Sequence, residues 1–323
     1  MQSGASRSHG GAIRAPRAGA TAATPSGVPA NGVVVASRRR HFLVQQDDGE
    51  LVECVLKGRH TTLACGDRVR VAGAAGGGSI EAVAPRTTLF YRSDAFKEKL
   101  IAANVDQVIG VVAPDLSIDE ELVNRWIVAA EAAACRFVLA ANKADKAGFD
   151  GLLARLAPYA ALGYAVVPMS AKRDPAPLLP WLAGRNTVLI GQSGMGKSTI
   201  LNAVLPDAAA KTAEISVALL TGRHTTTHST LYPLPEAQGN GWIVDSPGMK
   251  AFGLAHLAPA AIAHAFVDIR PLLGHCRFRD CRHDREPGCA VQRAVAAGDV
   301  APHRVALLHA LIAESKAARA PGR

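Results

Sequence analysis

The stretch with the most specific chemistry in this sequence is a glycine-rich loop, GQSGMGKS. It fits the pattern G-x-x-x-x-G-K-[ST], follows the apolar run TVLI and opens a helix-like segment, which is the context that a phosphate-binding loop requires. Backbone N–H groups of such a loop wrap around phosphate oxygens, helped by the positive end of the following helix. We expect Lys197 to reach the β- and γ-phosphates of a nucleotide, and Ser198 to bind Mg²⁺. The loop residues predicted to bind the nucleotide are Gly191, Gln192, Ser193, Gly194, Met195, Gly196, Lys197 and Ser198.

Two further motifs, NKAD and SAK, indicate which base the site reads. The Asp145 carboxylate of NKAD can accept hydrogen bonds from N1–H and from the exocyclic amine of guanine, whereas adenine has neither donor. The backbone of SAK would contact the guanine oxygen. Each motif alone is an ordinary turn at a strand end, so an ATP-dependent kinase with the same phosphate loop is an alternative. The predicted guanine contacts come from Asn142, Lys143, Asp145, Ser170, Ala171 and Lys172.

Downstream of the phosphate loop, the stretch WIVDSPG has the pattern D-x-x-G. We expect Asp245 to hold Mg²⁺ through water, and the N–H of Gly248 to sense the γ-phosphate. The polar stretch TGRHTTTHST between the two motifs is the place for a switch threonine on Mg²⁺. We assign this role to Thr226, because a threonine pair at this distance before the aspartate is common in related GTPases. Thr225 and Thr227 remain alternatives.

One expected catalytic side chain is missing. Met249 directly follows D-x-x-G, where Ras-like enzymes place a glutamine that orients the attacking water. An apolar side chain cannot polarise water, so intrinsic hydrolysis should be slow. His224 is a candidate replacement, which would act as a catalytic residue together with Lys197 and Thr226. The alternative is that a partner orders the loop.

The order of the motifs is unusual. In most GTP-binding chains the guanine motif follows the phosphate loop, but here Asn142 precedes Gly191 by 49 residues. The ordinary order 1-2-3-4-5 becomes 4-5-1-2-3, which is a circular permutation. A site built from strand ends tolerates this change if the original termini lie close together. Because D-x-x-G moves when the γ-phosphate leaves, the segment that follows it is attached directly to a switch.

That following segment carries a cluster of soft metal ligands. The spacing C-x4-C-x-H-x5-C supplies the four ligands of a tetrahedral structural Zn²⁺ site and leaves no open position for a catalytic water. His275 is a minor alternative to the histidine of this pattern, and a redox or disulfide role is the alternative for its cysteines. Five arginines, at 277, 279, 282, 285 and 293, crowd in and beside the loop and suit phosphate backbones. The predicted zinc ligands are Cys276, Cys281, His283 and Cys289.

The elements that must position these motifs form successive blocks. Residues 31–85 contain five short β-rich runs between turn-prone stretches, which predicts a small barrel of OB type, with an SH3-like barrel as the alternative. From residue 106, strand-like runs alternate with helical patterns, which predicts a mainly parallel sheet with helices on both faces. The predicted divisions are 1–30, a disordered basic arm; 31–87, the barrel; 88–262, the permuted GTPase domain; and 263–323, a zinc-stapled helical domain.

Composition and charge narrow the functional classes. No apolar run in the 323 residues approaches the roughly 20 needed to cross a bilayer. Residues 1–40 hold six Arg and no acidic residue, and residues 263–323 hold ten Lys/Arg against six Asp/Glu. Basic ends favour a polyanionic partner, although a solubilising tail is the alternative for the arm. Without a signal sequence, the clustered cysteines indicate a reducing compartment, the cytosol, and we expect Cys54, Cys65 and Cys135 to be buried thiols.

Together these motifs closely resemble the circularly permuted bacterial GTPases called ribosome small-subunit-dependent GTPase A. The matching motifs are NKAD, SAK, GQSGMGKST, GRHTTT, DSPG followed by FGL, and HCRF-x-x-C-x-H-x-x-EPGCAV. The likeness leaves out only the N-terminal arm. It implies an N-terminal OB-fold, a central GTPase domain and a C-terminal zinc domain. It also implies a role in late assembly of the 30S subunit, with GTP hydrolysis stimulated by that particle.

On this basis we expect a cytoplasmic, monomeric GTP hydrolase that binds the 30S ribosomal subunit and its 16S rRNA and no membrane. The predicted ligands are GTP or GDP, Mg²⁺ and one structural Zn²⁺. The bound nucleotide would set the orientation of two flanking RNA-binding modules. One alternative is a GTP-gated RNA-binding module in which hydrolysis is incidental. Another is a zinc-dependent structural protein with a relict nucleotide site.

Overall fold

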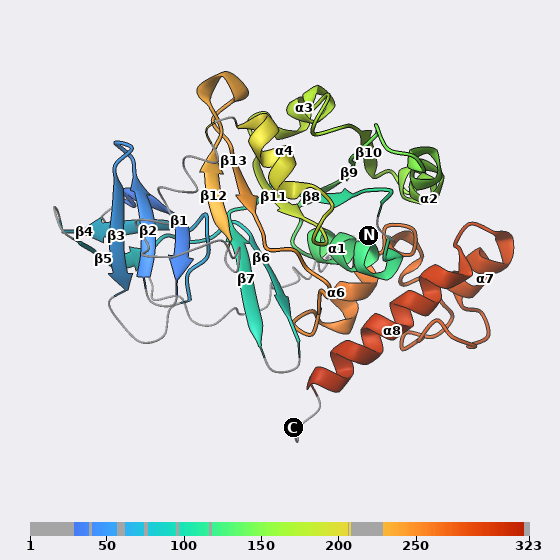
Figure 1. The fold of residues 1–323 in the computed structure, drawn as a ribbon. Coiled ribbons are helices and arrows are strands. Elements are labelled where there is room, and N and C mark those ends of the chain that lie inside the picture. Colours follow the sequence, from blue (N-terminus) through green and yellow to red (C-terminus); the bar gives the residue numbers. More distant parts are fainter. Residues whose placement is uncertain are drawn as a thin grey trace, which may run out of the picture.

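The computed structural model describes residues 29–38, 41–56, 62–73, 77–94, 97–115, 118–205, 207 and 229–319. A small β-barrel lies at one end of the molecule, a sheet flanked by helices fills the middle, and a helical block lies at the other end (Figure 1). Most of the predicted N-terminal arm lies outside the described residues, so its prediction stays open. Within the described part of the chain, no helix combines the length and the apolar character that crossing a membrane would require.

Five strands close the N-terminal barrel. They are β1 (Gly32–Arg38), β2 (His41–Gln46), β3 (Leu51–Leu56), β4 (Arg68–Ala72) and β5 (Gly78–Val83). The strands pair in the order β1-β2-β3-β5-β4, and β4 pairs back to β1, which is an OB-like closure and confirms that prediction over the SH3-like alternative. Alternating side chains, among them Val34, Phe42 and Ile80, fill the interior. The buried Asp67 carboxylate is paired with Arg86 at 2.6 Å.

A second set of strands forms the central sheet. It comprises β8 (Gln107–Val112), β9 (Arg136–Ala141), β10 (Ala165–Pro168), β11 (Asn186–Ile190), β12 (Thr230–Pro233) and β13 (Trp242–Asp245). The order is β10-β9-β8-β11-β13-β12, in which only β12 is antiparallel to its neighbour. β12 also pairs with β1 of the barrel, so one continuous sheet runs through both parts. The carboxyl ends of the five parallel strands therefore lie along one edge, where α/β sheets bind ligands.

Helices cover both faces of this sheet, as predicted. They are α1 (Glu120–Ala132), α2 (Phe149–Ala161), α3 (Leu179–Leu182) and α4 (Lys197–Val204), with the short 3-10 turns η1 (Ala176–Leu178) and η2 (Glu236–Gln238). β8 is buried on both sides: Val108 and Val112 pack in the cluster that holds α1 and α2, whereas Ile109 and Val111 pack in the cluster that holds α3 and α4. Alternation of successive side chains across a strand produces this division.

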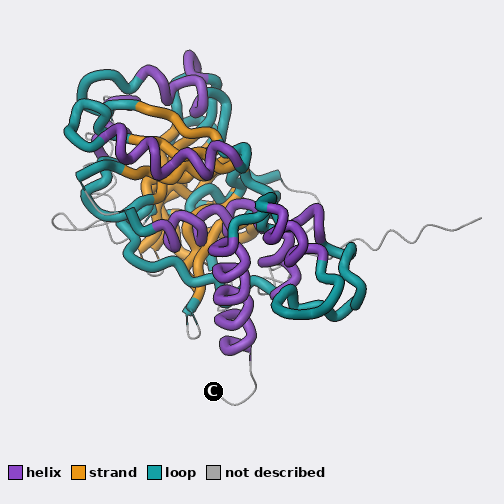
Figure 2. Tube along the Cα trace, turned by 90° about the vertical axis from the view of Figure 1, so that its right-hand side faces the viewer, coloured by secondary structure: helices purple, strands orange, loops and turns teal. Residues whose placement is uncertain are grey.

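The C-terminal block is helical and packs against α1. It contains α6 (Pro259–His264), η3 (Arg270–Leu272), α7 (Ala290–Ala297) and the long α8 (Pro302–Arg319), which runs toward the C-terminal end in both views (Figures 1 and 2). Arg304 of α8 forms a buried ion pair with Asp268 at 2.7 Å and donates to the Asn124 side chain of α1 at 2.6 Å. A buried, satisfied guanidinium therefore joins the block to the central domain.

A two-stranded hairpin follows the barrel in the chain and precedes the central sheet, and it is not among the predicted elements. Its strands are β6 (Leu89–Ser93) and β7 (Glu98–Ala103). Ser93 at the end of β6 pairs with Leu254, beyond the D-x-x-G motif. The hairpin therefore contacts the segment that leaves the switch.

The three scattered cysteines are buried and free, as predicted. Burial raises the pKa of the Cys54 thiol to about 11 and that of Cys65 to about 12. They are structural thiols with little thiolate character.

Candidate functional site

The loops after the parallel strands surround one cavity of about 720 Å³. The predicted site residues that line it are Asn142, Lys143, Asp145, Ser170, Ala171, Lys172, Ser193, Gly194, Gly196, Lys197, Ser198, Asp245 and Gly248. The other three predicted loop residues, Gly191, Gln192 and Met195, belong to the same phosphate loop but do not line the cavity. The predicted His224 and Thr226, and the alternative threonines beside Thr226, lie outside the described residues.

The phosphate loop connects β11 to α4, which begins at Lys197 beside the cavity. Gly196 has φ +99°, a conformation that side-chain-bearing residues rarely adopt, and a Cβ there would collide with the Asn142 amide. The Lys197 ammonium group donates to the carbonyls of Gly191 at 2.8 Å and Gln192 at 3.2 Å, so the loop folds over its own lysine. The buried Met195 side chain anchors the turn in the core below α4. The loop is therefore preformed for phosphate oxygens at a helix N-terminus.

Asn142 joins the guanine loop, which carries NKAD, to the phosphate loop and to the loop that carries SAK. Its amide nitrogen donates to the Met195 carbonyl at 3.0 Å, and its side-chain oxygen accepts from the Ala171 N–H at 2.9 Å. The Ser170 hydroxyl donates to the Asp145 carboxylate at 2.6 Å, and this bond is the main cause that lowers the pKa of Asp145. An ionised carboxylate thus lies in the cavity wall, as recognition of two guanine N–H groups requires.

The sequence motifs missed six residues that line the cavity, which are Asp115, Lys146, Arg173, Thr199, Ser246 and Pro247. The Lys143 ammonium group bonds both oxygens of Asp115, at 2.6 and 2.9 Å, and also the Gly194 carbonyl at 2.7 Å. Asp115 therefore holds the lysine that spans from the guanine loop to the phosphate loop. Arg173 lies 3.9 Å from Asp145. The position of Asp115 just beyond β8 could have indicated that it belongs to the site, because the carboxyl end of β8 lies between those of β9 and β11.

The Asp245 carboxylate is buried, and its Oδ1 atom has no hydrogen-bond partner among the described residues. Burial raises the pKa of Asp245 to about 6, and the nearby Lys197 ammonium group opposes the shift. A buried, unsatisfied oxygen in the cavity that Ser198 also lines fits a divalent cation, since Mg²⁺ prefers oxygen ligands. Ser198 and Asp245 would hold Mg²⁺, which would neutralise charge on the phosphates.

D-x-x-G packs tightly against the phosphate loop. A Cβ on Gly248 would lie 2.9 Å from the backbone nitrogen of Ser193, so only glycine fits this approach. Met249, in the position of the missing glutamine, is buried, and its N–H donates to the Gly191 carbonyl at 3.2 Å. The Met249 side chain is therefore largely shielded from solvent and offers no polar group to an attacking water.

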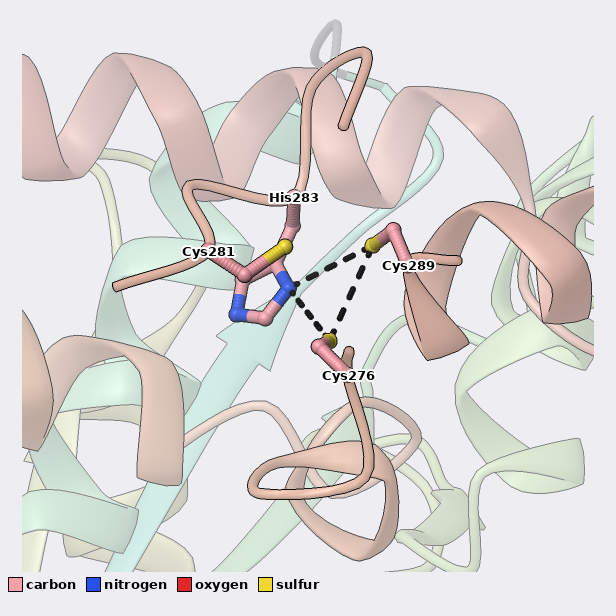
Figure 3. Close-up of side chains that lie close together, drawn as sticks. All are labelled: Cys276, Cys281, His283 and Cys289. Atoms are coloured by element: carbon pink, nitrogen blue, oxygen red, sulfur yellow. Dashed lines mark hydrogen bonds between the residues drawn. The ribbon is translucent and has the colours of Figure 1, made fainter. Parts of the chain in front are cut away.

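The four predicted zinc ligands converge (Figure 3), and their donor atoms lie within 4.8 Å of one another. The distances are 3.9 Å between the Sγ atoms of Cys276 and Cys289, and 3.5 and 3.6 Å from these sulfurs to Nδ1 of His283. A tetrahedral zinc with ordinary bond lengths gives edges of about 3.8 Å between sulfurs and about 3.6 Å between sulfur and nitrogen. The donor set and its spacing thus fit a structural Zn²⁺.

Backbone donors support these thiolates. The N–H groups of Ala290 and Gln292, at the start of α7, point at the sulfurs of Cys276 and Cys289, at 3.4 and 3.5 Å. The Gln292 side chain also donates to the His283 carbonyl at 2.7 Å. A helix N-terminus and oriented N–H groups stabilise negative sulfur, which favours a bound cation.

Parallel strand ends that carry a guanine motif ahead of the phosphate loop define a circularly permuted P-loop GTPase. The chain belongs to the RsgA GTPase family, whose family model matches residues 83–255.

Individual relatives agree with this assignment over nearly the whole chain. The small ribosomal subunit biogenesis GTPase RsgA of Nitrosospira multiformis is 48% identical over 295 residues, which cover 91% of this chain and 93% of the relative. The protein of that name from Burkholderia pseudomallei is 46% identical over 300 residues, covering 91% and 95%. Among solved structures, YjeQ from Thermotoga maritima has a TM-score of 0.68 at 28% identity, covering 90% of this chain and 99% of that one. YloQ, described as a circularly permuted GTPase, has a TM-score of 0.65 at 25% identity, covering 92% and 98%.

Proposed function

We propose that this protein binds the small ribosomal subunit during its maturation and hydrolyses GTP to GDP and phosphate with stimulation by that particle. The observation that supports this most is the combination of a preformed guanine and phosphate cavity with relatives that are named small ribosomal subunit biogenesis GTPases. The partner would be the 30S particle and its 16S rRNA. The protein would act as a monomer in the cytoplasm.

In this proposal each cavity residue has a distinct task. Asp145 reads the guanine N–H groups, and Lys143 covers the base. Lys197 exchanges its two carbonyl partners in the phosphate loop, Gly191 and Gln192, for the β- and γ-phosphates. The predicted switch residue Thr226 and the candidate catalytic residue His224 would complete the site. Because Met249 offers no polar group, the subunit would supply or order the group that positions water.

Contacts beyond D-x-x-G support a link from the nucleotide to the C-terminal block. Arg125 of α1 forms an ion pair with Glu314 of α8 at 2.7 Å and donates to the Phe252 carbonyl at 3.4 Å. On the same segment, the Ser315 hydroxyl of α8 donates to the Leu257 carbonyl at 2.6 Å. A shift of D-x-x-G on loss of the γ-phosphate would therefore displace α8. Through α8 it would also displace the zinc loop, residues 276–289, which carries the four predicted zinc ligands.

The proposed RNA-binding parts flank the GTPase domain. We place the barrel at 31–87, the GTPase domain at 88–262 and the zinc-binding helical domain at 263–323. OB-type barrels commonly bind single-stranded nucleic acid, and the exposed arginines of the zinc loop suit a phosphate backbone. The zinc ion would act as a structural staple, since four protein ligands leave no place for a catalytic water.

The decisive experiment is GTP turnover by the purified protein alone, with 30S subunits and with 50S subunits. Lys197→Ala serves as the blank because it removes the phosphate-binding ammonium group. We expect a large increase with 30S subunits that is absent with 50S subunits and in the blank.

A slow turnover that 30S subunits leave unchanged would count against the proposal. The buried Met249 would then favour the second candidate, a GTP-gated RNA-binding module in which hydrolysis is incidental. That candidate predicts equal 30S binding with GTP and with a non-hydrolysable analogue, and equal release from both.

A further inference from the structure

Phe278 is the one exposed Phe, Tyr or Trp side chain among the described residues, with 42% of its surface accessible. The other described Phe, Tyr and Trp rings are buried or half-buried. Phe278 lies in the zinc loop between the ligands Cys276 and Cys281, so the metal site would hold the backbone on both sides of it. An isolated exposed apolar residue needs no explanation, but a rigidly held one with charged neighbours does.

A guanidinium group lies against the Phe278 ring. The Arg277 Cζ atom lies 5.5 Å from the centroid of the Phe278 ring, within the range of a cation–π contact. Five arginines lie in the zinc loop or in the first turns of α7. Within the described chain, none of them forms an ion pair with an acidic side chain, and all of them are exposed; they are Arg277, Arg279, Arg282, Arg285 and Arg293.

The acidic residues of the loop do not cancel this charge. There are three of them against the five arginines, and one, Glu286, is engaged by the loop itself. Its carboxylate accepts from the backbone N–H groups of Arg282 and Asp284 at 2.8 and 2.9 Å. The surface around Phe278 therefore combines a flat apolar face with uncompensated positive charge.

We propose that Phe278 stacks on an unpaired nucleobase of RNA while the adjacent arginines contact the phosphates on either side. Every base has a π face, and aromatic side chains beside cationic groups are how proteins hold single-stranded nucleic acid. Duplex RNA keeps its bases stacked inside the helix and offers the ring no such partner. This inference rests on the proposed function for its partner, RNA, and adds that the zinc loop reads an unpaired base.

The rigid loop adds a physical reason for this choice. Ordering a flexible loop on binding costs free energy, whereas a loop closed by a metal has already lost that freedom. The Arg277 N–H donates to the Gly288 carbonyl at 3.1 Å, and the Cys281 N–H donates to the Phe278 carbonyl at 3.4 Å. Backbone hydrogen bonds thus hold the loop on both sides of Phe278.

The test compares the full-length, zinc-loaded wild type with Phe278→Ala and Phe278→Tyr. Fluorescence anisotropy measures binding of a mixed-sequence single strand of about twelve nucleotides, within the footprint of such sites, and of the same strand annealed to its complement. We expect Phe278→Ala to weaken single-strand binding by roughly 10- to 100-fold, to leave duplex binding unchanged, and to keep the salt dependence of the wild type. Phe278→Tyr retains a ring and should bind like the wild type.

Arg285→Ala is the matched control from the same loop. Losing one phosphate contact should weaken single strand and duplex alike and reduce the slope of log affinity against log salt by about one. Zinc content equal to that of the wild type verifies that each variant has kept its loop.

Several results would overturn the inference. They are unchanged single-strand binding by Phe278→Ala, an equal loss on single strand and duplex, a wild type without single-strand preference, and a loss of 30S binding without any loss on RNA. The last result would assign Phe278 to a protein partner. Turnover of the wild type with 30S subunits, measured on the same preparation, reports separately on the proposed function. Its failure would leave the single-strand comparison to decide the role of Phe278.

Discussion

The Asp145 carboxylate offers the sharpest test of the guanine site. One of its oxygens accepts from the Ser170 hydroxyl at 2.6 Å, and the side chain is only 15% exposed. Asp145→Asn keeps the shape and leaves one oxygen to accept from Ser170, but it replaces the other oxygen with a donor. Guanine presents two donors at this place, so its exocyclic amine would face the new donor and lose its hydrogen bond, and its N1–H would keep only a neutral amide acceptor.

The size of the effect follows from the charge on the acceptor. A hydrogen bond to an ionised group contributes about 1.5 to 3 kcal/mol and one to a neutral group about 0.5 to 1.5 kcal/mol, so losing one and weakening the other costs about 2.5 to 4.5 kcal/mol. This corresponds to roughly 10²- to 10³-fold weaker binding of GDP. Xanthine carries a carbonyl where guanine carries the exocyclic amine, so the asparagine amide can donate to it. XDP binding should therefore improve in the variant while GDP binding falls.

The assay is equilibrium binding of fluorescent GDP, XDP and ADP. Asp174→Asn serves as the control, because Asp174 lies four residues beyond Ser170 but does not line the cavity. We expect the control and the wild type to prefer GDP strongly over ADP. If Asp145→Asn bound GDP as tightly as the wild type and gained nothing for XDP, Asp145 would not be the guanine reader, and the adenine alternative would have to be reconsidered.

Three further predictions test the metal site, the cavity wall and the switch-proximal packing. Cys289→Ser should lose the zinc, because only three of the four converging ligands remain, whereas Cys135→Ser, at a buried cysteine outside the cluster, should keep it. A chromogenic chelator measures the zinc released on unfolding. Equal zinc in both variants would contradict the site. Asp115→Ala should weaken GDP binding by about two- to fivefold, because it frees the Lys143 ammonium group from a partly exposed ion pair, and unchanged affinity would mean that the Gly194 contact suffices. Burial, and the nearby Arg319, lower the pKa of His256 from 6.5 to about 4, so between these values the unfolded chain binds a proton that the folded chain excludes. Stability should fall as the pH drops through this range, by up to about 3 kcal/mol, and His256→Gln should flatten that part of the curve in urea unfolding; parallel curves would refute the assignment.

Much of the site was predictable because the residues that carry its chemistry lie in short sequence motifs. A phosphate loop needs its glycines and lysine at adjacent positions, and a zinc site on one loop needs its ligands within a few residues of each other. The alternation of strand-like and helical patterns likewise indicates a parallel sheet, and the ends of parallel strands lie on one edge. The permuted order could therefore be read directly from the chain, because a site at strand ends depends little on how the strands are connected.

The remaining features depend on contacts between residues that are far apart in the chain. The lysine of NKAD is 28 residues from its partner Asp115, and Ser93 of the β6–β7 hairpin pairs with Leu254 across the whole GTPase domain. No local pattern marks such pairs, since charged residues and short apolar runs occur throughout the sequence. The exposure of Phe278 is of the same kind. A phenylalanine is expected to be buried. Only the folded zinc loop, in which Cys276 and Cys281 on either side of Phe278 converge with the other predicted ligands, places this ring in solvent beside the arginines. The sequence by itself determined which chemical groups this protein has and along which edge they gather. The tertiary structure alone decided which of them meet, because packing of distant segments sets those distances.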